Sequence, residues 1–170
     1  MNGYRAFVQE RANAEDGQVV LNRTTEHAAV VLSIVFDKAD RLVEIVSGEL
    51  DDSVWSVEAV ILSAIAFLQR DAAASIHVVV EQNLDLVGNG FLSALRDAGF
   101  LDRIRLFRAP AELTQQYRYH FIVADGRHYR FQRDRTTFEA MIQFGVEETG
   151  SKLRKLFAWL VSESQQIPLG

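Results

Sequence analysis

The order of helical and extended segments along the chain constrains its fold more than any other feature of the sequence. Three segments carry apolar residues at helical spacing, and a short extended run rich in β-branched residues follows each of them. The helical segments are 25–38, 51–71 and 91–98, and the extended runs are 41–46, 75–80 and 104–107. Strands that alternate with helices in this way form a sheet whose faces are covered by the helices.

The second part of the chain predicts a β-hairpin. Two extended runs, 118–124 and 128–131, flank Asp125-Gly126, a dipeptide that favours the tight turn of a hairpin. The run 118–124 has no wholly polar side, so we expect it to be an inner strand of the sheet. A third run, 138–144, is expected to pair with these two strands.

The complete pattern predicts one α/β domain. A last helix with an apolar stripe begins at Glu147 or Ser151, which gives a mixed β-sheet with helices on both faces. The chain has 170 residues, of which 48% are hydrophobic, and this is sufficient for one buried core. The predicted boundaries are a polar lead-in at 1–23, the domain at 24–165 and a tail at 166–170.

Composition excludes several classes of protein. The longest apolar run, 28–36, is about half of the ~20 residues that a membrane helix needs, so we expect no contact with a membrane. Residues 1–10 contain no apolar run of the kind found in secretory signals, and the expected location is cytoplasmic. The absence of cysteine excludes disulfides, thiolate catalysis and cysteine-based zinc sites. We expect no cofactor.

Positive charge is concentrated in one segment. Residues 101–135 hold eight arginines, no lysine and four carboxylates, a net charge of +4 in a chain whose total is −5. The rest of the chain therefore carries −9, and a surface that binds anions must be local. Arginine suits this role because its guanidinium holds a phosphate or carboxylate with two parallel hydrogen bonds. Solvated arginines in loops and at a strand edge are the alternative interpretation.

The stretch 118–131, RYHFIVADGRHYRF, resembles the motif region of the phospholipase D-like superfamily. The signature of that family is His-x-Lys, four residues, then Asp-Gly, and Asp125-Gly126 matches its last two residues. Arg118 then stands at the position of the family's nucleophilic histidine, and His120 at that of its lysine. The family's Gly-Ser-x-Asn element falls on 132–135, which here is Gln-Arg-Asp-Arg.

The resemblance covers about 24–164 and includes the order of the other segments. The pieces that carry it are RLVEIVSGEL, SIHVVVE, FLSALRDAGF followed by IRLF, and the closing helix KLRKLFAWLV. It implies the phospholipase D-like fold. It also implies a homodimer, because family members with one motif per chain pair two domains to build one site.

The substitutions in the motif predict a site that binds phosphate and does not cleave it. In the family the histidine attacks phosphorus, whereas Arg118 stays protonated near neutral pH and has no lone pair to offer. His120 lies on the same side of the strand but two residues from the usual point of attack. We therefore expect no catalytic residue. The candidate ligand-binding residues are Arg118, His120, Asp125, Arg133 and Arg135.

A metal site is not expected. His120, Asp125 and His128 are suitable residue types, but the hairpin turn separates them and their spacing matches no known set of ligands.

Three functions are compatible with this sequence. The first is a catalytically inactive phospholipase D-like domain that binds a phosphate-containing ligand or serves as a protein-assembly module. The second is an atypical homodimeric phosphodiesterase or nuclease that uses His120. The third is a purely structural or regulatory subunit whose arginines meet an acidic protein partner. Convergence of the arginines in one cleft would favour ligand binding, and their dispersal along an exposed edge would favour the third function.

Overall fold

The described residues form a mixed sheet between two layers of helices. The computed structural model describes residues 2–85 and 87–170, and these form eight strands in the order β1-β7-β6-β5-β2-β3-β4-β8. The strands are β1 Val20–Asn22, β2 Leu42–Ser47, β3 Ser75–Val80, β4 Ile104–Arg108, β5 His120–Ala124, β6 His128–Gln132, β7 Ala140–Gln143 and β8 Gln165–Ile167. The helices are α1 Asn2–Ala14, α2 Thr25–Lys38, α3 Asp52–Trp55, α4 Glu58–Arg70, α5 Gly90–Asp97, α6 Ala111–Thr114 and α7 Glu147–Ser162, with a 3-10 turn at Leu101–Arg103.

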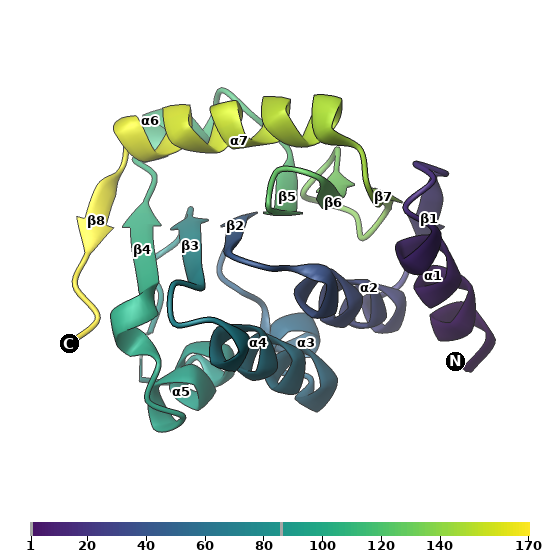
Figure 1. The fold of residues 1–170 in the computed structure, drawn as a ribbon. Coiled ribbons are helices and arrows are strands. Elements are labelled where there is room, and N and C mark those ends of the chain that lie inside the picture. Colours follow the sequence, from purple (N-terminus) through teal and green to yellow (C-terminus); the bar gives the residue numbers. More distant parts are fainter. Residues whose placement is uncertain (1, 86) are drawn as a thin grey trace.

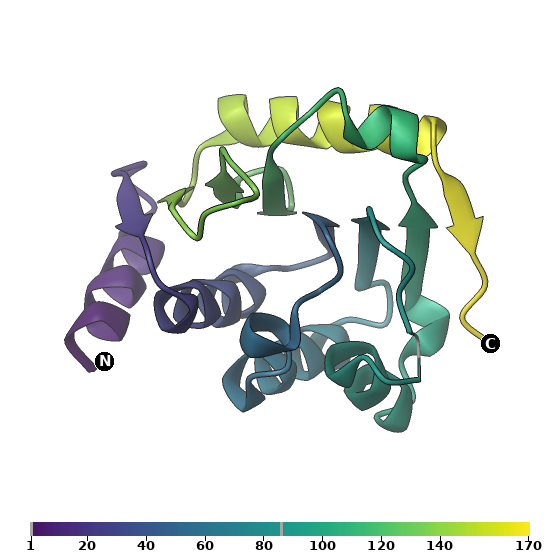
Figure 2. The same ribbon diagram turned by 180° about the vertical axis from the view of Figure 1, so that it is seen from behind.

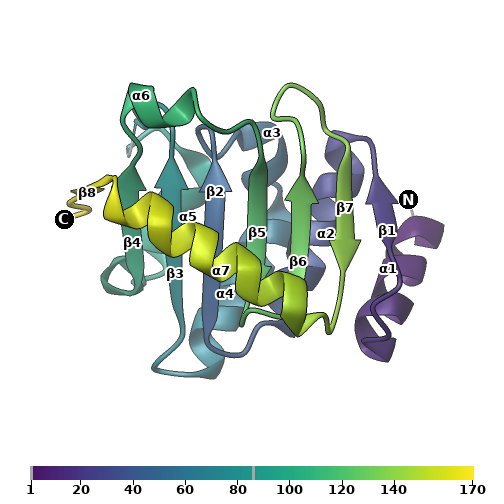
Figure 3. The ribbon, with the colours of Figure 1, turned by 90° about the horizontal axis from the view of Figure 1, so that it is seen from above.

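Helices cover both faces of the sheet, as the sequence predicts. The helices α2, α3, α4 and α5 lie against one face, and α7 lies against the other (Figure 1). Seen from above, α7 crosses the sheet diagonally, from β6 and β7 toward β4 and β8 (Figure 3). The predicted fold class is therefore confirmed. None of the described helices combines the length and the apolar character that a membrane span requires.

The strand β2 is the boundary between a parallel and an antiparallel half of the sheet. On one side β2, β3 and β4 run parallel, in the register Val43↔Ile76 and Ile76↔Ile104. On the other side β5 pairs with β2 in the antiparallel direction, and β6, β7 and β1 continue that pattern. The strand β5 is thus an inner strand, as expected, although it begins at His120 and not at Arg118.

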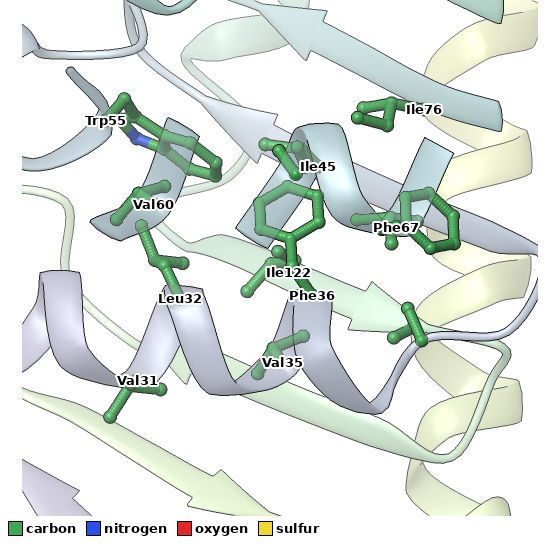
Figure 4. Close-up of a cluster of buried hydrophobic side chains, with 14 of the residues drawn as sticks. Val31, Leu32, Val35, Phe36, Ile45, Trp55, Val60, Phe67, Ile76 and Ile122 are labelled. Carbon is green, nitrogen blue, oxygen red and sulfur yellow. The ribbon is translucent and has the colours of Figure 1, made fainter. Parts of the chain in front are cut away.

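The larger core lies between the sheet and the layer of α2 and α4. Phe36 of α2 and Phe67 of α4 are fully buried with ring centroids 6.1 Å apart, and Ile45 of β2 lies beside them (Figure 4). Trp55 closes one end of this cluster. A second core lies under α7, where Leu153, Phe157 and Leu160 pack against β5 and β6. Alternate residues of each central strand therefore face different cores.

The first 23 residues contribute more than the predicted polar lead-in. The helix α1 buries Val8 and Ala12 completely, and β1 pairs antiparallel with β7 at one edge of the sheet. Figure 2 shows α1 beside this edge, with β8 at the opposite one. The sequence signal is weak here because α1 buries few apolar side chains and β1 has only three residues.

Two further boundaries differ from the prediction. Two residues of the tail expected at 166–170, Gln166 and Ile167, belong to β8, which pairs antiparallel with β4, and Leu169 packs against the larger core. The helix expected at 51–71 is divided into α3 and α4, because Ser56 and Val57 leave the helical conformation.

Replacing Phe36 with alanine should destabilise the protein by about 3–5 kcal/mol, because the cavity left in a close-packed core relaxes only in part. Phe7→Ala is the matched control, since the Phe7 side chain is 47% exposed and its loss should cost about 1 kcal/mol or less. Urea unfolding followed by circular dichroism measures both values. Equal losses for the two variants would contradict the assigned core.

Candidate functional site

A cavity lies where the parallel half of the sheet meets the antiparallel half. It is at the carboxyl ends of β2 and β3, beside the first residue of β5 and the last residue of β6, and its volume is about 240 Å³. In open α/β sheets ligands bind outside the carboxyl ends of the parallel strands. Its charged side chains are those of Glu49, Asp51, Glu81, Arg130 and Arg135, and His120 and Gln132 lie among them.

Arg130 is a buried cation in the wall of this cavity. It lies in the middle of β6 and is only 7% exposed. Its Nε donates to Asn22 Oδ1 at 2.9 Å, Nη1 to Gln132 Oε1 at 3.2 Å, and Nη2 to the Phe138 carbonyl at 3.4 Å. All three acceptors are neutral. Burial lowers the pKa of Arg130 to about 10, so the guanidinium remains charged at neutral pH.

No counter-ion accompanies this charge within the described residues. Neither Glu81 nor any other carboxylate described by the structure lies within 4.0 Å of the Arg130 guanidinium. A buried charge normally has an oppositely charged partner, since desolvation costs several kcal/mol per ion even after relaxation. Arg130 is therefore an unneutralised positive centre at the cavity.

Glu81 is the partner of the two other basic residues that line the cavity, His120 and Arg135. It lies directly after β3, and its Oε1 is 3.0 Å from Nε2 of His120 while its Oε2 accepts from Nη1 of Arg135 at 2.8 Å. Arg135 also donates to the carbonyls of Thr114 and Tyr117, at 2.6 and 2.8 Å. Arg135 and His120 thus have an internal partner and are less available to a ligand than Arg130.

The pKa of Glu81 reflects this arrangement. Burial of the side chain, which is 9% exposed, would raise the pKa, but the hydrogen bonds and charges of His120 and Arg135 outweigh burial and lower it. Glu81 therefore stays ionised at neutral pH. Its contribution to stability is present above the unfolded-state pKa near 4.5 and is lost as the pH falls below that value.

The structure brings together two of the candidate residues and separates the others. His120 and Arg135 both line the cavity. Arg118 precedes β5 with its side chain exposed, and its carbonyl accepts from the Arg135 amide at 2.7 Å. Arg133 follows β6 and lines a different hollow with Leu21 and Phe131. Strand alternation explains this separation. The even-numbered residues of β6 face the larger core, under α2 and α4, whereas the odd-numbered residues from 129 to 133 face the α7 side of the sheet.

Asp125 lies at the other end of β5 and does not line the cavity. Its carboxylate accepts from the backbone amides of Asp40, Arg41 and Leu42, at 2.6, 2.9 and 2.9 Å. Asp125 and Gly126 both have positive φ, as a tight hairpin turn requires. In this structure Asp125 joins the hairpin turn to the connection between α2 and β2.

Sequence reasoning found His120 and Arg135 but missed three other side chains that line the cavity, those of Glu81, Arg130 and Gln132. Arg130 was counted only as one of eight arginines, although a basic residue between Tyr129 and Phe131 in a predicted strand is an unusual signal. Glu81 directly follows the β-branched run of β3. Residues at the carboxyl end of a parallel strand are candidates for a ligand site, so its position was a usable signal. Gln132 lies two residues beyond Arg130 and therefore on the same side of β6.

Comparison with solved structures identifies the fold. The protein Nuc from Salmonella typhimurium, a phospholipase D family member, superposes with a TM-score of 0.62 over 89% of this chain and 99% of that chain, at 12% identity. NucT from Helicobacter pylori gives 0.60 over 89% of this chain and 100% of that chain, at 11% identity. The chain has the phospholipase D-like fold. The fold implied by the sequence resemblance is thus confirmed.

A third similar structure is TrmBL2, an archaeal chromatin protein with a novel mode of DNA binding. It gives a TM-score of 0.63 over 98% of this chain and 62% of that chain, at 10% identity. Identities of this size show a shared fold and nothing finer. No family model matches the sequence, and no curated protein matches it.

Replacing Asp125 with alanine should lower the free energy of unfolding by about 1–3 kcal/mol, because three backbone amides lose their acceptor. Asp125→Asn should cost less, since asparagine keeps one acceptor oxygen and tolerates positive φ. Asp97→Ala is the control, because Asp97 is exposed and, within the described ranges 2–85 and 87–170, its one ion pair is with its neighbour Arg96. Denaturant titration of the three variants tests the order, and an Asp125→Ala protein as stable as wild type would refute the role assigned to this carboxylate.

Proposed function

We propose that this protein binds a phosphate-bearing ligand in the Arg130 cavity and does not cleave it. The observation that carries the proposal is the buried guanidinium of Arg130, which lines the cavity without a carboxylate partner among the described residues. A phosphate group would supply the missing counter-charge. The proposal moves the centre of the expected anion site from Arg118 and Arg133 to Arg130, with His120, Gln132 and Arg135 beside it.

The hydrogen-bonding capacity of Arg130 supports this role. A guanidinium has five N–H groups, and three of those of Arg130 are used on neutral acceptors. The remaining two are available for the paired hydrogen bonds that arginine makes with phosphate. Desolvation strengthens such bonds, because the attraction between opposite charges is greater away from bulk water.

The surroundings of His120 support binding without cleavage. A covalent route through phosphohistidine needs a free imidazole nitrogen and an acid for the leaving group. His120 is bonded to Glu81 through Nε2 and is the only histidine among the described residues that line the cavity, so no second histidine is in place to protonate a leaving group. Arg118, at the position of the family's nucleophile, lies outside the cavity.

One observation favours the second candidate, a homodimeric phosphodiesterase or nuclease. A buried carboxylate orients the His120 imidazole, and this is how many enzymes hold a catalytic histidine. Pairing of two chains, which stays a prediction from the resemblance, would bring two copies of His120 together. The acidic remainder of the chain, at −9, argues against long nucleic acids as substrates or ligands.

Thermal shift with inorganic phosphate tests the binding proposal. Wild type should gain stability with increasing phosphate, and Arg130→Gln should lose this gain, because the variant has no charge to pair. Arg133→Gln is the matched control and should respond as wild type does, since Arg133 lies on the other side of the sheet. Because Arg130 also bonds to Asn22 and the Phe138 carbonyl, Arg130→Lys keeps the charge as a check on folding.

Glu81→Gln gives an independent test that does not depend on the folding of an Arg130 variant. Glutamine cannot neutralise Arg135 or His120, so the affinity for phosphate should rise by about tenfold, the effect of removing one nearby like charge from an anion site. Isothermal titration calorimetry measures the affinity. Unchanged or weaker phosphate binding by Glu81→Gln, with no response of wild type to phosphate, would reject the proposed function.

Assays with bis(p-nitrophenyl) phosphate and with short single-stranded DNA test cleavage. We expect no turnover above background, because His120 has no second histidine beside it, among the described residues that line the cavity, to serve as the acid. Metal-independent hydrolysis that disappears in His120→Ala and persists in His77→Ala would establish the phosphodiesterase instead.

A further inference from the structure

A second hollow of opposite charge adjoins the Arg130 cavity. Its volume is about 420 Å³, and it is formed by the loops after β2 and β3 together with the start of α3. The two hollows share Glu49 and Asp51 in their walls. Carboxylates dominate the second hollow: Glu49, Asp51, Asp52 and Asp85.

These carboxylates have no basic partner in the part of the chain that the structure describes. None of the four lies within 4.0 Å of a lysine, arginine or histidine nitrogen described there. Asp51, Asp52 and Asp85 each direct one oxygen to a backbone amide, those of Ser53, Gly90 and Val87 at 2.8, 3.1 and 3.0 Å. The Glu49 side chain is exposed and makes no hydrogen bond with any residue that the structure describes. Carboxylate oxygens thus remain available to a ligand.

The two hollows together form a site with two unneutralised charges of opposite sign. The positive centre is the buried Arg130, and the negative centre is the acidic wall that begins at Glu49 and Asp51. Neither centre neutralises the other, because no carboxylate contacts the Arg130 guanidinium among the described residues. A ligand with a second phosphate would meet repulsion at the acidic wall.

We infer that the ligand is a compact zwitterion, with a terminal phosphate that meets Arg130 and an ammonium group that meets Glu49 and Asp51. This inference rests on the proposed function, since it assigns the phosphate to the same cavity. The small volume of the Arg130 cavity fits one phosphate and a short chain, because drug-sized ligands occupy about 300–1,000 Å³. The acidic wall selects against oligonucleotides and nucleoside polyphosphates.

Calorimetric titration of two matched probes tests the inference. The probes are 3-aminopropyl phosphate and propyl phosphate, which differ only in the ammonium group and have flexible chains. Wild type should bind 3-aminopropyl phosphate about tenfold more tightly, the selectivity expected from one partly exposed charge pair. In a Glu49→Gln, Asp51→Asn double variant the two probes should bind equally. Asparagine keeps the cap on the first turn of α3, so folding should be preserved.

The outcomes separate this inference from the proposed function. Equal binding of both probes by wild type, or tighter binding of propyl phosphate, overturns the zwitterion and leaves the phosphate site standing. Binding of neither probe overturns both. Selectivity that persists in the double variant also overturns the inference, because the acidic wall would not be its source. An Asp102→Asn, Glu112→Gln variant, altered outside both hollows, is the control and should keep the selectivity of wild type.

Discussion

The antiparallel pairing of β5 with β2 is the constraint on which the rest of the structure depends. The strand β2 is parallel to β3 on its other side. This pairing therefore joins a half of the sheet with parallel strands to a half with antiparallel strands. The register Val46↔Phe121 sets His120 beside the end of β2 and directs it toward the α2 layer. A shift by one residue would turn His120 toward α7 and exchange the contents of the two cores.

Much of the fold could be predicted from the sequence because its central elements carry strong local signals. The run of β3, SIHVVV, and the turn Asp125-Gly126 leave few alternatives, and both were predicted correctly. The edge elements could not be placed, because their stability comes from tertiary contacts. The strand β1 is held by its pairing with β7, and β8 by its pairing with β4. Each has too few residues to show the alternation of apolar and polar side chains that identifies a strand.

The site was harder to predict because charge composition does not say how charges are paired. Sequence reasoning grouped Arg118, His120, Arg133 and Arg135 by proximity along the chain, yet Glu81, which neutralises two of them, precedes His120 by 39 residues. For Arg130 the burial was predictable and the hydrogen-bond partners were not. Its neighbours Tyr129 and Phe131 suggest a buried strand, but only the structure shows that its partners are neutral.

The position of Asp125 at the far end of β5 has a consequence for how such proteins diverge. The contacts of the Asp125 carboxylate, which fasten the hairpin turn to the start of β2, lie at one end of the sheet, and the cavity lies at the other. Residues that face a ligand can therefore change over evolutionary time while the scaffold persists. A lineage built in this way can acquire new specificities, or lose an old activity, without first passing through an unstable ancestor.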